Sequence, residues 1–351
     1  MMYNNNSVFV CFDKKRHIDK KLLGRVFMAK TQTAAVSAQE KQAAKEKTWI
    51  KLKRDKWMYL LLLPGVLYFI IFKIVPLWGI LISFKDYFAG VPFLKANWIG
   101  FDNFIDFFTD ISFWQLLRNT LIISFMNLIF FFPLPIILAL LLNEIRVQWY
   151  KKVLQTFVYV PHFVSMVVVT SITFMLIKTP AMEGAAGGMI TELLSKLTGH
   201  DVNILGNGPA IYWILLIQAI WKECGWGTVI FLAAIAGVDM EQYEAAIVDG
   251  ASRFQQLIYI TLPAILGTIV TMFILRMGSV LNTGFEQIIL MQNDINREYS
   301  ETFDTYVYQY GRVEGNYGYS TAVGLFKSIV SLLCIQLSNR GAKAVGQAGL
   351  F

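Results

Sequence analysis

Residues Glu244–Pro263 read EAAIVDGASRFQQLIYITLP, and this stretch separates two long apolar segments of the chain. Asp239 lies just before it and three residues before Gln242, which is the spacing of a helix-capping box. Glu241 and Glu244 then fall in the first turns, where negative charge is favourable because the helix dipole is positive there. The pattern predicts a short helix that begins near Asp239.

The second half of the stretch predicts a turn followed by a second helix. Asp249 and Gly250 form a turn pair, since glycine reaches positive φ without a steric penalty. Ser252 repeats the capping-box spacing with Gln255 and restarts the helix. We therefore expect two short helices at an angle, exposed at a membrane surface. An ordinary interfacial helix-turn-helix is the alternative interpretation.

The composition indicates an integral membrane protein. Hydrophobic residues make up 56% of the chain and charged residues 16%, whereas soluble domains carry about 25% charged residues. A spanning helix needs about 20 mostly apolar residues. Six segments meet this requirement, so we expect an all-α integral membrane protein with six transmembrane helices, near Trp57–Phe84, Phe113–Leu142, Val153–Lys178, Ala210–Ala236, Leu262–Met291 and Tyr319–Leu337.

Basic residues predict the orientation, because loops on the cytoplasmic side carry an excess of Lys and Arg. Residues 1–56 contain fourteen Lys and Arg against five Asp and Glu. The loop Asn143–Lys152 and the C-terminal tail also carry basic residues. With six spans, these regions and the two-helix loop at 239–263 fall on one side, so both termini are predicted to be cytoplasmic.

Three regions are expected along the chain. Residues 1–50 are polar and basic and form an N-terminal cytoplasmic arm, either a solvated tail or a segment attracted to anionic membrane lipid. Residues 51–340 form the transmembrane domain, and residues 341–351 form a cytoplasmic tail.

No pattern of residues predicts chemistry within this chain. The P-loop spacing GxxxxGK[ST] is absent, as are GxSxG and HExxH. The histidines lack metal-ligand spacing and the cysteines lack a pairing pattern; they are His17, His162, His200, Cys11, Cys224 and Cys334. We therefore predict no catalytic site, no metal site and no nucleic-acid partner, with any coupled ATP hydrolysis on another polypeptide.

The stretch at 244–263 resembles the cytoplasmic coupling loop of bacterial ABC importer permeases, in which EAA is followed by three residues, Gly, nine residues and Ile-x-Leu-Pro. Other segments are similar to permeases of the polysaccharide/oligosaccharide branch of the carbohydrate-uptake family. This similarity covers roughly Trp57–Arg340 and rests on LLPGVLYFIIFKIVPLWGILISFKDY, FWQLLRNTLIIS, PIILALLLNEIR, YVPHFVS, LNTGFEQ and YSTAVGLFKS.

The resemblance implies a permease subunit that translocates oligosaccharides across the bacterial cytoplasmic membrane by alternating access. It implies a second permease subunit, with a heterodimer favoured, two ABC ATPase subunits that hold ATP and Mg, and an extracytoplasmic solute-binding protein. No cofactor is expected in this chain. The residues expected to couple it to the ATPase are Glu241, Glu244, Ala245, Ala246, Asp249, Gly250 and Arg253.

Polar residues inside spanning helices are costly and usually face the bundle interior. Sugars have apolar ring faces and a rim of hydroxyls, so aromatic rings beside amides or carboxylates suit them. The resemblance implies substrate contacts near Val280–Gln287 and in the helix before the coupling loop. Interhelical hydrogen bonding is the alternative role. The candidate substrate-binding residues are Gln218, Glu223, Trp226, Arg276, Asn282, Thr283, Phe285 and Gln287.

Glu223 and Arg276 both come near the middle of the membrane at about 1.5 Å rise per residue. An unpaired charge there is expensive, so we expect them to pair across consecutive helices, with substrate contact as the alternative. If Arg276 were free, it and Lys222 would favour an anionic sugar. If Arg276 were paired, a neutral sugar would fit better.

Two other interpretations remain open. The cargo of such an importer could be an amino acid, a peptide or an oxyanion. The chain could also be a membrane-embedded enzyme or a scaffold. An enzyme should show a cluster of acid/base or metal-binding groups, and a scaffold has no need of mid-membrane polar residues beside a coupling motif.

Overall fold

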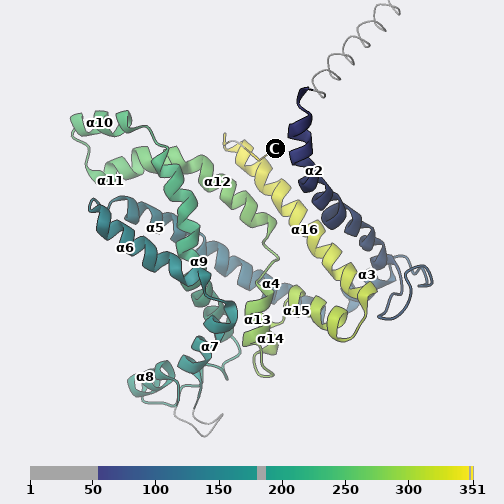
Figure 1. Ribbon diagram of the computed structural model, residues 1–351. Helices are drawn as coiled ribbons and strands as arrows, with labels where there is room; N and C mark the ends of the chain where they lie inside the picture. The colour runs from purple at the N-terminus through teal and green to yellow at the C-terminus, as the bar shows by residue number, and fades with distance from the viewer. Residues whose placement is uncertain (1–53, 180–186, 348, 351) are drawn as a thin grey trace, which may run out of the picture. The chain divides into compact units, whose positions relative to one another are not determined.

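The computed structural model describes residues 54–179, 187–347 and 349–350. The chain divides into one unit that ends at Trp78 and a second that begins at Gly79. Within the described residues the chain forms helices and turns, with two isolated β-bridges and no strand (Figure 1). The helical fold class is therefore confirmed. The arm expected at residues 1–50 lies outside the described residues.

The first unit contains the start of an apolar helical stretch, Lys56–Phe84. This stretch consists of α2 (Lys56–Phe69), a π-helical turn η1 (Ile70–Ile74) and a 3-10 segment η2 (Val75–Phe84). No side chain of α2 is buried. A helix that is apolar on all sides needs lipid or another helix around it.

Four further helical stretches, all in the second unit, are long and apolar enough to cross a membrane, which makes five in the described residues. One is α4 (Ser112–Met126), η3 (Asn127–Phe131) and α5 (Pro133–Asn143). Another is α11 (Arg253–Gln256), η6 (Leu257–Thr261) and α12 (Leu262–Gly278). The remaining two are α9 (Ala210–Ala236) and α16 (Tyr317–Ala344).

Each π-helical turn within these stretches lies just before a proline. Pro76, Pro133 and Pro263 follow η1, η3 and η6 within two residues. Proline lacks a backbone N–H and its ring crowds the carbonyl four residues earlier. A wider turn relieves that crowding without ending the helix. The prolines thus remain inside apparently continuous spans.

The prediction of one continuous helix over Val153–Lys178 is wrong. The structure has α6 (Gln148–Tyr159), η4 (Val160–Phe163) and α7 (Met166–Ile177), with a bend of 97° between the two halves. Val164 and Ser165 are extended, and the Ser165 hydroxyl caps α7 by accepting from the Val168 N–H. The bent pair brings the number of spans to six only if its two halves count as one crossing.

The prediction of one helix over Leu262–Met291 is also wrong. Helix α12 ends at Gly278, and a second helix, α13 (Phe285–Met291), begins after six intervening residues. Gly284 has φ of +89°, a conformation that side chains with a Cβ rarely adopt. We refer to residues 279–284 as the TM5 break.

Helix α9 lies at the centre of the second unit and packs along α5, while α12 packs along α16 (Figure 1). Gly225 of α9 allows a close approach to α6, since a Cβ at this position would overlap the Val158 carbonyl. Two apolar clusters surround α9. One centres on Ile211, Leu215 and Ile288, and the other on Phe231 and Ile265.

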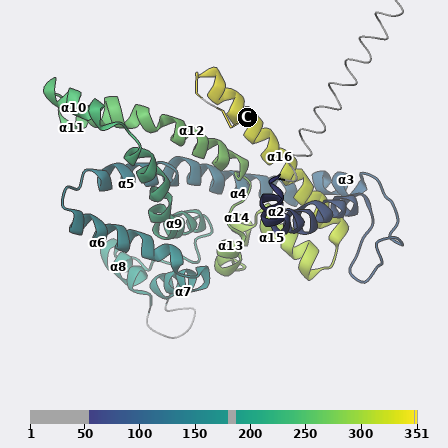
Figure 2. The ribbon, with the colours of Figure 1, turned by 45° about the horizontal axis from the view of Figure 1, so that its top comes forward.

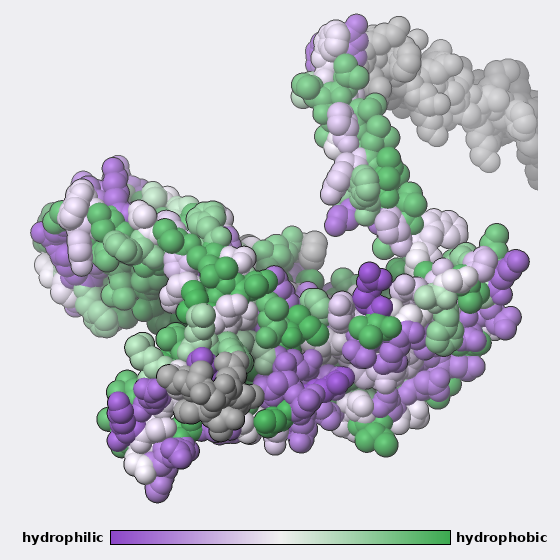
Figure 3. Space-filling view, turned by 60° about the horizontal axis from the view of Figure 1, so that its bottom comes forward, coloured by the Kyte–Doolittle hydropathy of each residue, from purple (hydrophilic) through white to green (hydrophobic). Residues whose placement is uncertain are grey.

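The two ends of the second unit differ in what they carry. One end carries α10 (Met240–Val248) and α11, and the C-terminal end of α16 lies on the same side (Figures 1 and 2). The opposite end carries α8 (Met189–Thr198), α13 and α14 (Arg297–Ser300). Figure 3 shows hydrophilic residues gathered around this opposite end.

An aromatic cluster joins the short helix α3 (Asp102–Thr109) to α15 (Phe303–Tyr308) and the start of α16. Phe107 and Phe303 are fully buried, with ring centroids 5.9 Å apart. A π-helical turn, η7 (Gln309–Val313), leads from α15 toward α16. This cluster fixes α15 beside α16, which matters for the site below.

Candidate functional site

A cavity of about 470 Å³ lies beside the TM5 break. It contains six of the eight residues expected to bind substrate, namely Glu223, Arg276, Asn282, Thr283, Phe285 and Gln287. Helices α9, α12 and α13, η3 and α7 contribute to the wall. The other lining residues are Asn127, Met166, Ala219, Lys222, Gly284 and Glu286.

Arg276 brings an uncompensated positive charge to this cavity. Its guanidinium carbon lies 5.4 Å from the centroid of the Phe131 ring. Among the described residues, the side chain is half-buried and has neither an ion pair nor a hydrogen-bond acceptor. The expected Glu223–Arg276 ion pair is therefore wrong, although both residues line the same cavity.

Glu223 is paired with neighbours other than Arg276. Its carboxylate oxygens lie 3.1 Å from Lys222 Nζ and 2.7 Å from His162 Nδ1. Lys222 Nζ also donates to the His162 carbonyl at 2.7 Å. These contacts tie α9 to η4 just before the 97° bend, and they leave no partner for Arg276. This role of His162 was not predicted from the sequence, which showed only that the histidines lack metal-ligand spacing.

Trp226 packs instead of facing the cavity. Its ring stacks on His162, with centroids 4.6 Å apart and planes 4° from parallel. It is not among the residues that line the cavity. In the sequence, Pro161 next to His162 could have indicated that His162 contacts polar groups, because non-helical backbone at membrane depth is found where it lines a cavity or is buried in protein.

The TM5 break is held at two points. The Ser124 hydroxyl on α4 donates to the Val280 carbonyl. The Thr283 N–H donates to Asp304 Oδ2 on α15 at 3.2 Å. The Thr283 hydroxyl is buried, finds no hydrogen-bond partner in the described part of the chain, and belongs to a residue that lines the cavity. A buried hydroxyl without a partner is costly, so it is ready to bond to a ligand.

The side-chain amides of Gln218 on α9 and Gln287 on α13 are hydrogen-bonded to each other. Gln287 Nε2 donates to Gln218 Oε1 at 2.9 Å and to the Leu215 carbonyl at 2.7 Å. Gln218 Nε2 in turn donates to Thr173 Oγ1 on α7 at 2.8 Å. Gln218 is buried and does not line the cavity. These amides brace three helices, which is the interhelical alternative considered for them.

Phe285 presents an aromatic surface at the wall of the cavity. Its ring centroid lies 4.9 Å from that of Tyr308. Asn282 lies in the TM5 break and is exposed. Asn127 of η3 also lines the cavity and was missed, although an amide in the middle of an apolar run is the signal that identified the others.

Both helices of the two-helix loop begin with an N-cap, although Asp239 caps through Glu241 and not through the predicted capping box with Gln242. The Asp239 carboxylate accepts from the Glu241 N–H at 3.0 Å. Ser252 and Gln255 make the reciprocal capping box. Gly250 has φ of +78°. The second helix is not separate, however, because α11 continues through η6 into α12 as one 26-residue stretch.

Side-chain contacts tie this loop to its surroundings. Tyr243 Oη lies 2.9 Å from Thr261 Oγ1, and Arg253 lies 3.6 Å from Glu144 at the end of α5. Beyond these contacts the loop is exposed, with Val248 at 87% and Phe254 at 71%. Glu241, Glu244, Ala245 and Asp249 are exposed as well, and Ala246 is partly buried beside them on α10. The loop thus offers an apolar, accessible surface.

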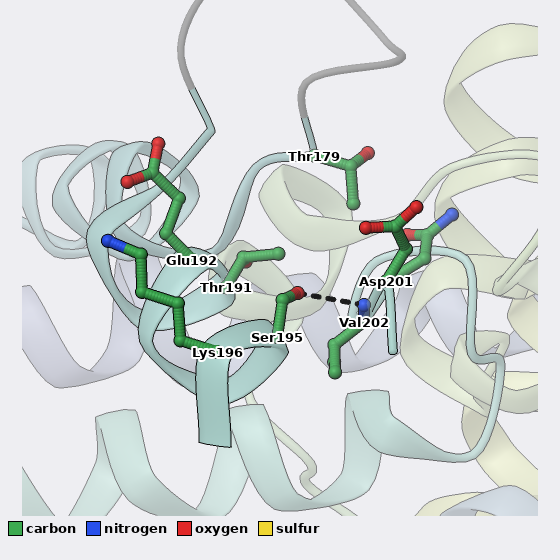
Figure 4. A pocket seen from close by; sticks show the side chains of 8 residues that line it. Thr179, Thr191, Glu192, Ser195, Lys196, Asp201 and Val202 are labelled. Carbon is green, nitrogen blue, oxygen red and sulfur yellow. Dashed lines mark hydrogen bonds between the residues drawn. The ribbon is translucent and has the colours of Figure 1, made fainter. Parts of the chain in front are cut away.

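A second cavity of about 470 Å³ lies at α8 (Figure 4). The Ser195 hydroxyl at its wall accepts from the Val202 N–H at 3.0 Å. None of the predicted site residues lines it. The described lining residues are Thr179, Thr191, Glu192, Ser195, Lys196, Asp201, Val202 and Asn203.

Comparison with known proteins adds independent information. Residues 132–345 match the family model described as "Binding-protein-dependent transport system inner membrane component". Protein LplB of Bacillus subtilis is 53% identical over 310 residues, which are 88% of this chain and 96% of that protein.

Two further similarities are informative. The polygalacturonan/rhamnogalacturonan transport system permease protein YteP of B. subtilis is 46% identical over 324 residues, which are 92% of this chain and 99% of that protein. A chain in the crystal structure of a bacterial alginate ABC transporter bound to an alginate-loaded periplasmic protein is similar at a TM-score of 0.77. It has 34% identity, with 86% of this chain and 99% of that chain covered.

Proposed function

This chain belongs to the family of inner membrane components of binding-protein-dependent transport systems, and from that membership we propose that it conducts acidic, uronate-containing oligosaccharides across the bacterial cytoplasmic membrane. It is a permease subunit of an oligosaccharide ABC importer. The acidic character of the cargo is the part that the cavity adds.

Arg276 is the observation that supports an acidic cargo. Its guanidinium lines the cavity and has no acceptor among the described residues, because Lys222 and His162 engage Glu223. Guanidinium groups bind carboxylates through two parallel hydrogen bonds. An incoming uronate would supply the missing negative charge. Glu286 also lines the cavity, but it is exposed, so water screens its charge.

The polar and aromatic groups near Arg276 suit the rest of a sugar. The unpartnered Thr283 hydroxyl and the Asn282 amide can bond to sugar hydroxyls, and the Phe285 ring offers an apolar face. The relatives support this class of cargo as well. YteP is named for polygalacturonan and rhamnogalacturonan, and the solved transporter is described as importing the acidic polysaccharide alginate.

The continuous stretch Arg253–Gly278 supports a mechanism for coupling. Its start belongs to the exposed two-helix loop, and its end carries Arg276 and the TM5 break. A displacement of the loop by an ATPase would move the cavity wall as one body. We assign the receiving surface to Glu241, Glu244, Ala245, Ala246, Asp249, Gly250 and Arg253.

The proposed assembly follows from the family. It contains a second permease subunit, two ATPase subunits that hold ATP and Mg, and an extracytoplasmic binding protein that delivers the sugar. ATP binding closes the ATPases and turns the cavity outward, and ATP hydrolysis returns it inward. This chain contributes the cavity wall and the coupling loop.

Uptake into proteoliposomes that contain the complete transporter tests the proposal. Matched oligosaccharides with uronate or with neutral sugar residues are compared. Wild type should prefer the uronate series, and Arg276→Gln should lose about tenfold or more of that preference, as expected for a charged hydrogen bond. Arg340→Gln, a change at an exposed arginine on α16, is the control. Equal transport of both series by wild type would overturn the acidic assignment.

A further inference from the structure

We propose that Asp304 acts as a positioning residue that holds the TM5 break in its sugar-facing conformation, with Lys327 orienting its carboxylate. This inference rests on the proposed function, because it takes the cavity at the break to be the sugar site. Neither residue lines that cavity. Their effect on transport must therefore pass through Thr283.

Two contacts that join three residues carry the inference. Asp304 Oδ2 accepts from the Thr283 N–H at 3.2 Å. Asp304 Oδ1 forms an ion pair with Lys327 Nζ on α16. The two charged side chains are only 21% and 13% exposed. One carboxylate thus connects the backbone of the TM5 break to a long spanning helix.

The break needs such an acceptor. Where a helix is interrupted, backbone N–H groups lose the carbonyl four residues earlier and must find another partner. The Thr283 N–H finds a carboxylate, which makes a stronger hydrogen bond than a neutral acceptor. Because a largely buried carboxylate is costly alone, Lys327 neutralises it and turns one oxygen toward the break.

The contact determines where the ligand-facing groups lie. Ser124 holds the carbonyl of Val280 at the start of the break, and Asp304 holds the N–H of Thr283 near its end. Between them lies Asn282, and the Thr283 hydroxyl remains without a partner. Loss of the second attachment would free the Thr283 backbone and disperse these groups without removing any of them.

A crossed pair of double variants separates positioning from simple stabilisation. Asp304→Lys with Lys327→Asp keeps an ion pair but places an ammonium, which cannot accept, beside the Thr283 N–H. Asp304→Asn with Lys327→Met removes the ion pair but keeps an amide oxygen that can accept. Ser328→Ala, a change on α16 next to Lys327, is the control.

The first measurement is the sugar concentration that gives half-maximal uptake, with saturating binding protein. Positioning predicts an increase of about tenfold for the exchanged pair, as for loss of one charged hydrogen bond, and less than about threefold for the neutral pair. The maximal rate and the yield of assembled complex should change less. The opposite ranking of the two variants would overturn the proposal and indicate a purely structural ion pair.

The second measurement is amide hydrogen exchange of the peptide that contains residues 279–284, in complex without sugar. Exchange at the break should be faster in the exchanged pair than in the neutral pair. Equal rates would contradict the inference even if no oligosaccharide were transported. If the exchanged pair does not assemble, Asp304→Leu with Lys327→Met, which lacks both the acceptor and the ion pair, takes its place.

The two proposals fail in different ways. Arg276→Gln should affect uronate sugars only, whereas the Asp304 variants should affect uronate and neutral sugars alike. A wild-type complex that ignores all oligosaccharides contradicts the proposed function and leaves the exchange measurement to decide the role of Asp304.

Discussion

The guanidinium of Arg276 and the carboxylate of Asp304 are two charges that differ in how the surrounding residues compensate them. Asp304 has both a cation and a backbone N–H, so its charge is compensated within the chain. For Arg276, the side-chain contact found among the described residues is with the ring of Phe131. A charge without an ionic partner is costly in a membrane, which supports the proposal that the ligand supplies its counter-charge.

Asp110, which lies between α3 and α4, has a pKa that is determined by its hydrogen bonds. Burial acts to raise the pKa of its carboxyl, but hydrogen bonds from the Tyr306 hydroxyl and the Ser112 backbone outweigh burial and hold the pKa below its usual value. The same surroundings strongly raise the pKa of Tyr306, through burial first and then its bond to Asp110. Tyr306 therefore stays neutral and donates.

We predict that Tyr306→Phe lowers the melting temperature at neutral pH, because a hydrogen bond to a charged group contributes about 1.5–3 kcal/mol. A carboxyl whose folded pKa is depressed stabilises the fold above its unfolded pKa of about 3.9, and this contribution is lost as pH falls through the folded pKa. The difference in melting temperature between wild type and Tyr306→Phe should therefore become smaller below about pH 4. Thermal melts in detergent over this range measure it.

Tyr259→Phe is the matched control, since Tyr259 is 76% exposed. Its melting temperature should equal that of wild type at every pH. A gap for Tyr306→Phe that stays constant from neutral to acid pH would show that the bond to ionised Asp110 is not its origin.

At the scale of elements, the two-helix loop and the TM5 break lie at the two ends of one continuous helical stretch, Arg253–Gly278. Helices α11 and α12 are joined by a π-helical turn before Pro263 and not by a loop. A rigid connection transmits displacement, whereas a flexible one would absorb it. The same argument makes the turn at Gly250, between α10 and α11, the point where the direction of movement is determined.

We predict that Gly250→Val reduces sugar-stimulated ATPase activity of the complete transporter by several-fold. No neighbouring atom lies within 4 Å of a Cβ at this position, so the effect is purely conformational. Gly250 has φ of +78°, and a residue with a Cβ pays about 1–2 kcal/mol there. Glu244→Lys, which reverses a charge on the exposed face of α10, should also reduce stimulation.

Gly267→Ala provides the comparison. It also has open space around the Cβ, but its φ is that of an ordinary helix, so stimulation should stay near wild type. Normal sugar-stimulated ATPase activity in both Gly250→Val and Glu244→Lys would contradict the proposed coupling role.

At the scale of the whole molecule, the number of membrane crossings determines which side of the membrane the two-helix loop and α8 face. The second unit carries the two-helix loop at one end and α8 at the other (Figures 1 and 2). Within the described residues, five helical stretches can cross a membrane, and the bent pair α6–α7 adds a sixth crossing if it counts as one. With six crossings, both ends of the chain would lie on the same side, which the basic loops predict to be the cytoplasmic side.

We predict opposite labelling of two cysteines introduced in a chain whose native cysteines have been replaced. Leu197→Cys on α8, where Leu197 is 74% exposed, should react with a membrane-impermeant maleimide in intact protoplasts. Val248→Cys on α10 should react only in inverted vesicles or after permeabilisation. Reaction of both positions from the same side would mean that the α6–α7 pair re-enters instead of crossing.

The sequence by itself determined the features that depend on local chemistry. The Ser252 capping box and the glycine turn at Gly250 formed as predicted, and Asp239 caps its helix through Glu241 in place of Gln242, because a cap satisfies N–H groups only two or three residues away. Apolar runs located most of the spans, since each run is long enough to cross lipid. Polar and aromatic residues within those runs identified six of the residues that line the cavity.

Only the tertiary structure decided where those spans break and which charges pair. Pro64 and Pro263 lie within continuous stretches while the chain bends sharply after Pro161, because neighbouring helices determine whether a freed backbone group is satisfied. Glu223 pairs with His162 and Lys222, and Lys327 of α16 forms an ion pair with Asp304 of α15. Such pairings depend on three-dimensional distance, which hydrophobic periodicity along one helix does not encode.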